Sequence, residues 1–336
     1  MAASEPTRPP EAAASRSGRP ASESQAPATR PGSGSADVLL LGAISLWALN
    51  FTVIKTGVAE LDPVTFPLLR CAAGSVLMVV VLWSRERSLT VARADLPLLV
   101  TAAALGVTLN GVFFVYSLVD AGASDVALLS STGPLVTAIL VFVFGLEPLP
   151  RRHWLGVVVG LGGVALIVFG SGIQSSSRAP LAGDALALGA VLSSSGAALP
   201  IRRLMRTYSA WRILTFEMTA GSLMLLPLAL PSLIRQNYAS VSLTGWASLG
   251  YAIVFSGVVA YVLYFTAIHR VGPAHAAMYG YLQTLLGVLF AVMLLGERLT
   301  TLQLLGALIV VGSVYWSRPQ TLAGRSHEPD GSLVAR

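Results

Sequence analysis

The chain has little charge for its length. Only 11% of its 336 residues are Asp, Glu, Lys or Arg, and 54% are apolar, whereas soluble domains carry about 25% charged residues. The mean hydropathy is +0.72, so most of the surface would be poorly hydrated in water. These values exclude an ordinary soluble protein and indicate that lipid surrounds most of the chain.

Cysteine is almost absent, since Cys71 is the single one and lies within an apolar run. An internal disulfide and a multi-cysteine metal site are therefore excluded. The four histidines, His153, His269, His275 and His327, have no metal-ligand spacing between them. A phosphate-binding loop and the Ser/Lys or Ser/His pair of a membrane protease are missing too. We expect no metal, no cofactor, no catalytic residues and no enzyme activity.

Negative charge is scarcer than positive charge, and the net charge is +6. A positive net charge can indicate nucleic-acid binding. The arginines, however, stand between apolar runs and form no stripe, which is typical of the basic connectors of membrane proteins. We expect no nucleic-acid partner.

Ten apolar runs are each long enough to cross about 30 Å of hydrocarbon as a helix. The predicted spans are residues 37–57, 64–83, 96–118, 124–146, 153–172, 183–202, 212–233, 245–268, 273–295 and 299–317. The predicted fold class is an all-α membrane protein with ten transmembrane helices. Short connectors favour antiparallel neighbours.

The basic connectors predict the orientation. Ten arginines lie in the connectors on one side, against three arginines and Lys55 on the other. Because Lys and Arg concentrate on the cytoplasmic side, we expect a multi-pass protein of the cell membrane with both termini in the cytoplasm.

The second half of the chain resembles the first. Shifts of 147 residues in the early part and 150 residues in the later part align the two halves, and the later match runs without gaps over residues 122–164. Matched pairs include Asp37 with Asp184, Lys55 with Arg202, and Glu147 with Glu297. Each copy has five spans, and an odd number turns the second copy upside down relative to the first.

The repeat defines the domain organisation. Residues 1–36 and 318–336 have no aliphatic runs and are predicted to be disordered cytoplasmic tails. Residues 37–172 form the first five-helix repeat, 173–182 a linker, and 183–317 the second repeat. Inverted repeats are typical of secondary transporters, although a purely structural duplication is an alternative. The expected partners are a small-molecule substrate and the lipid bilayer, and small-residue faces leave a homodimer open.

Several motifs resemble those of a known domain. Residues 46–51, Leu-Trp-Ala-Leu-Asn-Phe, with Lys55 and Arg70, resemble the first part of the EamA domain. Residues 296–300, Gly-Glu-Arg-Leu-Thr, resemble its closing motif, whereas the first copy at 146–150 departs from it. The resemblance covers about residues 37–316. It implies the drug/metabolite transporter superfamily, the ten-helix exporter type, with a central cavity lined by helices one, three, four, six, eight and nine.

Polar and aromatic side chains at membrane depth are the candidates for substrate binding, because such groups are costly there unless they have a function. Trp47 and Asn50 share a helix face, as do Tyr261 and Tyr264. The candidate residues are Trp47, Asn50, Arg70, Asn110, Ser131, Tyr264, Tyr281 and Gln283.

Other intramembrane residues have more local interpretations. Glu217 aligns with Arg70, but the predicted topology places the two near opposite sides, so an ion pair is not expected. Gly156, Gly160, Gly162, Gly163, Gly306 and Gly312 are predicted to permit close helix packing. Pro134 is predicted to bend the fourth span.

The sequence thus predicts a secondary transporter that exports small, amino-acid-like or drug-like metabolites by alternating access. A channel-like passive facilitator on the same fold, or a membrane receptor or assembly factor that transports nothing, are the alternatives.

Overall fold

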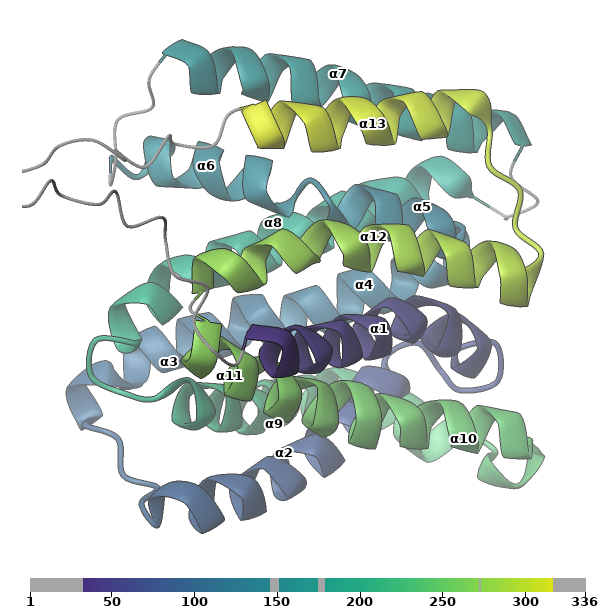
Figure 1. Ribbon diagram of the computed structural model, residues 1–336. Coiled ribbons are helices and arrows are strands. Elements are labelled where there is room, and N and C mark those ends of the chain that lie inside the picture. Colours follow the sequence, from purple (N-terminus) through teal and green to yellow (C-terminus); the bar gives the residue numbers. More distant parts are fainter. Residues whose placement is uncertain (1–32, 146–150, 175–178, 272, 317–336) are drawn as a thin grey trace, which may run out of the picture.

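The computed structural model describes residues 33–145, 151–174, 179–271 and 273–316, and every regular element in these ranges is a helix (Figure 1). Helices suit these apolar runs because a backbone surrounded by hydrocarbon must satisfy its N–H and C=O groups within its own segment. The all-α prediction is confirmed for the described residues.

The helices of the first half are α1 (Ser33–Gly57), α2 (Thr65–Glu86), η1 (Arg93–Asp95), α3 (Leu96–Ala103), η2 (Ala104–Leu109), α4 (Asn110–Asp120), α5 (Ala123–Ser130), α6 (Gly133–Val143) and α7 (Arg151–Gln174). Those of the second half are α8 (Pro180–Leu204), α9 (Ala210–Arg235), η3 (Tyr238–Ser240), α10 (Leu243–Tyr251), η4 (Ala252–Val259), α11 (Ala260–Val271), α12 (Pro273–Leu295) and α13 (Thr301–Trp316). The segments η2 and η4 are π-helices inside longer helices.

Seven of the described helices are long and apolar enough to cross a membrane, and they correspond to predicted spans one, two, three, five, six, seven and eight. The bent pair of α5 and α6 counts as an eighth if it is one span. The described apolar parts of α12 and α13, Tyr279–Leu295 and Thr301–Ser313, are shorter. The protein is therefore a multi-pass membrane protein.

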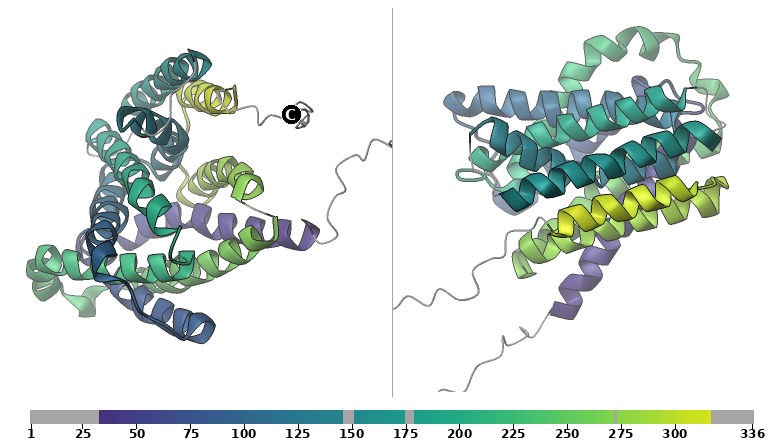
Figure 2. Two further views of the ribbon diagram at one scale, coloured as in Figure 1. Left: turned by 90° about the vertical axis from the view of Figure 1, so that its left-hand side faces the viewer. Right: turned by 90° about the horizontal axis from the view of Figure 1, so that it is seen from above.

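The main helix contacts join the two halves of the chain. Helix α7 packs along α13, α2 along α9, α1 along α11 and α12, and α4 along α8. Figures 1 and 2 show α7 and α13 side by side at one edge of the molecule. Under the self-alignment the contact of α1 with α11 is equivalent to that of α8 with α4, so the packing repeats between the halves.

Three of the predicted glycines let α7 and α13 approach closely, whereas a Cβ on Gly162 or Gly312 would meet no atom within 4 Å. A Cβ on Gly163 would lie 2.7 Å from the backbone oxygen of Gly306, and a Cβ on Gly306 would lie 2.5 Å from that of Gly163. A Cβ on Gly160 would lie 2.8 Å from Ser313 Oγ. Any larger side chain at these positions would push the helices apart.

The chain bends near Pro134, as the sequence predicts, and the bend lies between two helices. Helix α5 ends at Ser130, and α6 begins at Gly133 after a bend of 42°. Pro134 lies in the first turn of α6, where its missing N–H costs no hydrogen bond.

Large apolar side chains on the outside of the bundle suit a lipid surrounding. Strongly exposed examples are Val38, Val76, Val80, Leu223, Leu285 and Leu308. The largest buried apolar cluster includes Phe51, Phe66, Leu118 and Leu129 and packs the ends of α1, α4 and α5 together.

Candidate functional site

An aromatic cluster joins α1 to α11. The ring centroid of Trp47 lies 5.0 Å from that of Tyr261 and 5.1 Å from that of Tyr264. All three side chains are half-buried, so each presents an apolar ring and a polar N–H or O–H to its surroundings. The structure brings together two of the predicted residues, Trp47 and Tyr264, and adds Tyr261.

Each half of the chain carries a π-helix at the same place in its third span. The segment η2 begins at Ala104 and η4 begins at Ala252, and a shift of 148 residues relates these two positions. This shift lies between the shifts of 147 and 150 residues that align the two halves of the sequence. A π-helical turn breaks the regular i→i−4 hydrogen-bond ladder and often marks a functional position. Its recurrence indicates that the irregular backbone belongs to the duplicated unit.

Each π-helix also accepts a side-chain hydrogen bond from the first helix of the other half. Trp47 Nε1 of α1 donates to the Ser256 carbonyl in η4 at 3.1 Å. Ser193 Oγ of α8 donates to the Leu105 carbonyl in η2 at 2.7 Å. Such bonds satisfy carbonyls where a helix is irregular inside a membrane. The two halves therefore hold each other's irregular segments.

Some buried polar atoms have no hydrogen-bond partner among the described residues. Among them are Asn50 Oδ1, Arg70 Nε, Glu217 Oε1 and Ser256 Oγ. Asn50 and Glu217 are only 6% and 7% exposed. A buried polar atom without a partner costs free energy, so these four groups are suited to contact a polar solute.

Glu217 faces the first π-helix. A Cβ on Gly106 of η2 would lie 3.4 Å from Glu217 Oε1 and 3.2 Å from Ala197 Cβ of α8. The glycine thus leaves room where α8, α9 and η2 meet. In the described part of the chain, Arg70 and Glu217 form no ion pair with each other.

Two predicted site residues bond to the backbone instead. Asn110 Nδ2 donates to the Ala190 carbonyl at 2.9 Å and ties α4 to α8. Ser131 Oγ donates to the Leu128 carbonyl at 2.6 Å, next to the bend between α5 and α6. Neither belongs to the aromatic cluster.

The remaining predicted residues, Tyr281 and Gln283, lie half-buried on α12, which packs along α1. Near the start of α12, Tyr279 Oη donates to Asp37 Oδ1 at 2.9 Å, so Tyr279 links α12 to α1.

A polar contact that we name the clasp joins the two halves at one end of the bundle. Lys55 Nζ lies 3.4 Å from Glu297 Oε1, and it donates to the Ala121 carbonyl at 2.5 Å. The Glu297 carboxylate accepts from the backbone N–H groups of Ala123 and Ser124, both at 2.8 Å, and from Ser124 Oγ at 2.5 Å. It therefore caps the N-terminus of α5, where a negative charge is favourable.

The clasp carboxylate is adapted to being charged. Burial alone would raise the pKa of Glu297, but the hydrogen bonds from Ser124 and the Lys55 ammonium outweigh it and lower the pKa below its ordinary value. The sequence singled out Glu297 through the repeat and the closing motif, but not its contact with α5. Its counterpart Glu147 lies outside the described residues.

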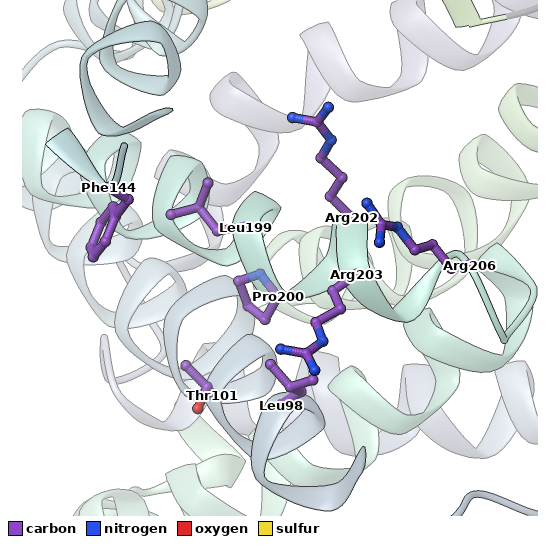
Figure 3. Close-up of a pocket in the computed structure, with 8 residues that line it drawn as sticks. All are labelled: Leu98, Thr101, Phe144, Leu199, Pro200, Arg202, Arg203 and Arg206. Atoms are coloured by element: carbon purple, nitrogen blue, oxygen red, sulfur yellow. The ribbon is translucent and has the colours of Figure 1, made fainter. Parts of the chain in front are cut away.

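An open groove of about 680 Å³ lies at the end of α8 (Figure 3). This end and the clasp are on opposite sides of the bundle (Figure 1). Its lining residues are Leu98, Thr101, Phe144, Leu199, Pro200, Arg202, Arg203 and Arg206. None of the predicted site residues is among them, and the sequence marked its arginines only as a basic connector.

The described residues hold no group of three or more His, Cys, Asp or Glu side chains that could bind a metal ion. His269 Nδ1 lies 2.7 Å from the Phe265 carbonyl, one turn back in its own helix. This contact is a local one at the end of α11.

Comparisons with known proteins agree with this architecture. The EamA-like transporter family matches residues 34–169 and 181–318. A relative from Archaeoglobus fulgidus, named an uncharacterized transporter, is 29% identical over 83% of this chain and 95% of its own length. The uncharacterized transporter YetK of Bacillus subtilis is 24% identical over 83% and 85%. The uncharacterized inner membrane transporter YedA of Escherichia coli K12 is 25% identical over 80% and 86%.

One solved crystal structure has the same fold, with a TM-score of 0.57 at 18% identity over 84% of this chain and 96% of that chain. The family match covers both halves and most of the chain. This multi-pass membrane protein therefore belongs to the EamA-like transporter family.

Proposed function

We propose that the protein is a secondary transporter that exports a small metabolite by alternating access. In this proposal residues 37–172 and 183–317 are inverted five-helix repeats with ten spans. The seven long helices, the bent pair α5–α6, α12 and α13 supply these spans. The two termini then lie in the cytoplasm, and the clasp lies on the outer side.

The observation that carries the proposal is the reciprocal bonding of the two π-helices. Trp47 holds η4 and Ser193 holds η2, each across the boundary between the halves. One such bond in each direction provides two places at which the halves can move against each other. If the regions around η2 and η4 exchanged their conformations, the protein would open first to one side of the membrane and then to the other.

The proposed substrate path runs beside the aromatic cluster. Trp47, Tyr261 and Tyr264 offer apolar ring faces, and Asn50 and Arg70 each offer a polar atom without a hydrogen-bond partner among the described residues. Such a surface suits a small amino-acid-like or drug-like solute. Tyr281 and Gln283 would extend this path along α12, while Asn110 and Ser131 would position the helices around it.

In this proposal the clasp stabilises the state in which the protein is closed on its outer side. It joins the end of α1, the start of α5 and the connector before α13. Because it links both halves, their separation on this side would break its hydrogen bonds. We propose that the clasp breaks whenever the protein opens outward.

Two other functions remain as rivals on this fold. A passive facilitator would transport the same solutes without saturation or exchange. A receptor, an assembly factor or an intramembrane enzyme would transport nothing. We favour a transporter that is not an enzyme, since the family match points to transport and the buried polar groups lie between helices of both halves.

The test is solute flux in proteoliposomes that contain the purified full chain. Amino acids, sugars, nucleosides and common drugs are offered one at a time, with pH and membrane potential set independently. We expect saturable flux and counterflow for one class. Flux that never saturates would favour the facilitator, and no flux of any class would contradict transport.

Variants on α12 then test the path. We expect Tyr281→Ala and Gln283→Ala each to reduce solute flux by about tenfold. Both variants should fold like the wild-type chain. Leu285→Ala is the matched control, because Leu285 is on the same helix and 65% exposed toward the surroundings. Normal flux in both site variants would remove α12 from the path.

A further inference from the structure

The groove at the end of α8 combines positive charge with apolar surface. Leu98 and Thr101 come from α3, and Phe144 follows α6. The end of α8 supplies Leu199 and Pro200, and Arg202, Arg203 and Arg206 lie at or just beyond that end. Figure 3 shows the three arginine side chains spreading around the end of α8, with Arg203 directed toward Leu98 and Thr101. The groove therefore presents both guanidinium groups and hydrocarbon side chains.

Two described acids of the neighbouring connectors are bonded to groups that do not line the groove. Glu86 pairs with Arg212 at 2.8 Å and also accepts a hydrogen bond from Ser209. Asp95 accepts a hydrogen bond from Tyr208 Oη at 2.7 Å. These carboxylates are already engaged, whereas Arg203 and Arg206 are exposed. An anion is the complementary ligand.

The apolar side chains of the groove limit which class of anion would bind there. Phe144 is 63% exposed and lines the groove together with Leu98, Leu199 and Pro200. A small hydrophilic anion would gain nothing from this surface. A ligand with both a phosphate and a hydrocarbon chain could contact the arginines with its phosphate and the apolar side chains with its chain. Each CH₂ of the chain that is buried there contributes about 0.8 kcal/mol.

The position of the groove indicates where such a ligand comes from. The groove lies on the side whose connectors carry most of the arginines, which is the side expected to face the cytoplasm. Met205, just beyond the end of α8, is a further exposed apolar side chain near this end of the helix. Basic pockets between transmembrane helices on this side are suited to lipid head groups.

We infer that the groove at the end of α8 is a binding site for an anionic phospholipid, with the head-group phosphate on Arg203 and Arg206 and an acyl chain along Phe144 and Leu98. Arg202 adds positive charge at the rim. The site lies apart from the aromatic cluster, so the inference does not depend on the proposed transport function.

Native mass spectrometry of the full chain, purified in a mild detergent, tests this site. Phosphatidylglycerol and phosphatidylcholine are titrated separately against the wild-type chain and the R203Q/R206Q variant. Each basic residue near an anionic lipid contributes a factor of about five in affinity, so the variant should bind phosphatidylglycerol about 25-fold more weakly. Its binding of phosphatidylcholine should not change.

The control is R87Q/R93Q, which removes the same charge from exposed positions in the connector after α2, outside the groove. It should bind phosphatidylglycerol like the wild-type chain. Equal loss in both double variants, or no loss in R203Q/R206Q, would overturn the site. Circular dichroism and thermal unfolding check that all variants are folded.

Two further measurements separate a lipid from a soluble anion. Phe144→Ala should weaken phosphatidylglycerol binding while the preference over phosphatidylcholine persists. Millimolar glycerol 3-phosphate should not displace the bound lipid. Displacement by this soluble phosphate, together with normal lipid binding by Phe144→Ala, would reassign the groove to soluble anions and overturn the lipid inference.

Discussion

Trp47 Nε1 donates a hydrogen bond to the Ser256 carbonyl, 209 positions away in the chain, at a distance of 3.1 Å. The bond links α1, the first helix of the first half, to the π-helix η4 in the second half. The same indole ring packs against Tyr261 and Tyr264. One side chain therefore serves both the proposed substrate path and the contact between the halves.

Trp47→Phe separates these two roles, since it keeps a ring but removes the N–H donor. We expect it to lower the free energy of unfolding by about 1 kcal/mol, the usual contribution of one hydrogen bond, and to slow the flux of the transported solute. Thermal unfolding and proteoliposome flux measure the two effects. Trp154→Phe is the control, because Trp154 is exposed on α7 and its ring meets that of Phe142 edge to face. Equal behaviour of the two variants would contradict a special role for Trp47.

Ser193→Ala removes the corresponding bond to η2. If the two π-helices act as a pair, this variant should slow flux as Trp47→Phe does, with a loss of about 1 kcal/mol in stability. Ser194→Ala is a close control, because Ser194 Oγ bonds only to the Val191 carbonyl of its own helix. A normal rate in Ser193→Ala alongside a slow rate in Trp47→Phe would show that the halves are not used equivalently.

The clasp predicts a loss of stability in acid. The pKa of Glu297 in the folded protein lies below its ordinary value of about 4.5. A carboxyl group with a lowered pKa stabilises the fold above its unfolded pKa, and this contribution disappears as the pH falls through the folded pKa. The wild-type melting temperature should therefore fall as the pH drops below about 4.5.

Glu297→Gln should lower the melting temperature at pH 7 and weaken its dependence on pH below 4.5. Hydrogen bonds to a charged group contribute about 1.5–3 kcal/mol, which sets the size of the loss. Asp120→Asn is the control, because it removes one negative charge next to Ala121 and leaves the Glu297 carboxylate in place; it should keep the wild-type melting temperature at pH 7. The clasp has no electrostatic role if the Glu297→Gln profile matches that of the wild-type chain.

The contact between α7 and α13 predicts opposite effects for two adjacent glycines. Gly163→Ala places a Cβ 2.7 Å from the Gly306 carbonyl oxygen and should destabilise the protein by about 1–3 kcal/mol, as overpacking usually does. Gly162→Ala meets no atom within 4 Å and should be neutral or stabilising, because Ala favours a helix. Thermal unfolding in detergent compares them, and a stable Gly163→Ala would mean that the helices can separate at low cost.

Some of this structure was predictable because single residues impose it. Pro134 cannot continue a helix from the preceding turn, and the bend of 42° follows. Gly163 and Gly306 marked a close approach of two helices, since only small residues permit it. Trp47 and Tyr264 were recognised individually as amphipathic rings at membrane depth. Their contact was not predictable, because helical periodicity gives the face of a residue but not the partner of that face.

The least predictable features are those that depend on tertiary packing. Residues 104–109 and 252–259 are ordinary apolar sequence, and nothing in them signals a π-helix. Asn110 was predicted as a site residue from its polarity, yet it serves the Ala190 carbonyl. The role of Glu297 at the start of α5 required the fold, because the two segments are far apart in the chain.

The orientation in the membrane is open to a direct test. The connector with Arg93 and the connector with Ser240 are exposed and, in the proposed topology, lie on opposite sides. Cys71 is buried, so a new surface cysteine should dominate labelling. We expect a membrane-impermeant maleimide to label Ser240→Cys in intact cells and to label Arg93→Cys only after permeabilisation. The reverse pattern would place the clasp on the cytoplasmic side and the groove of α8 on the outer side, and it would remove the inner leaflet as the source of its lipid.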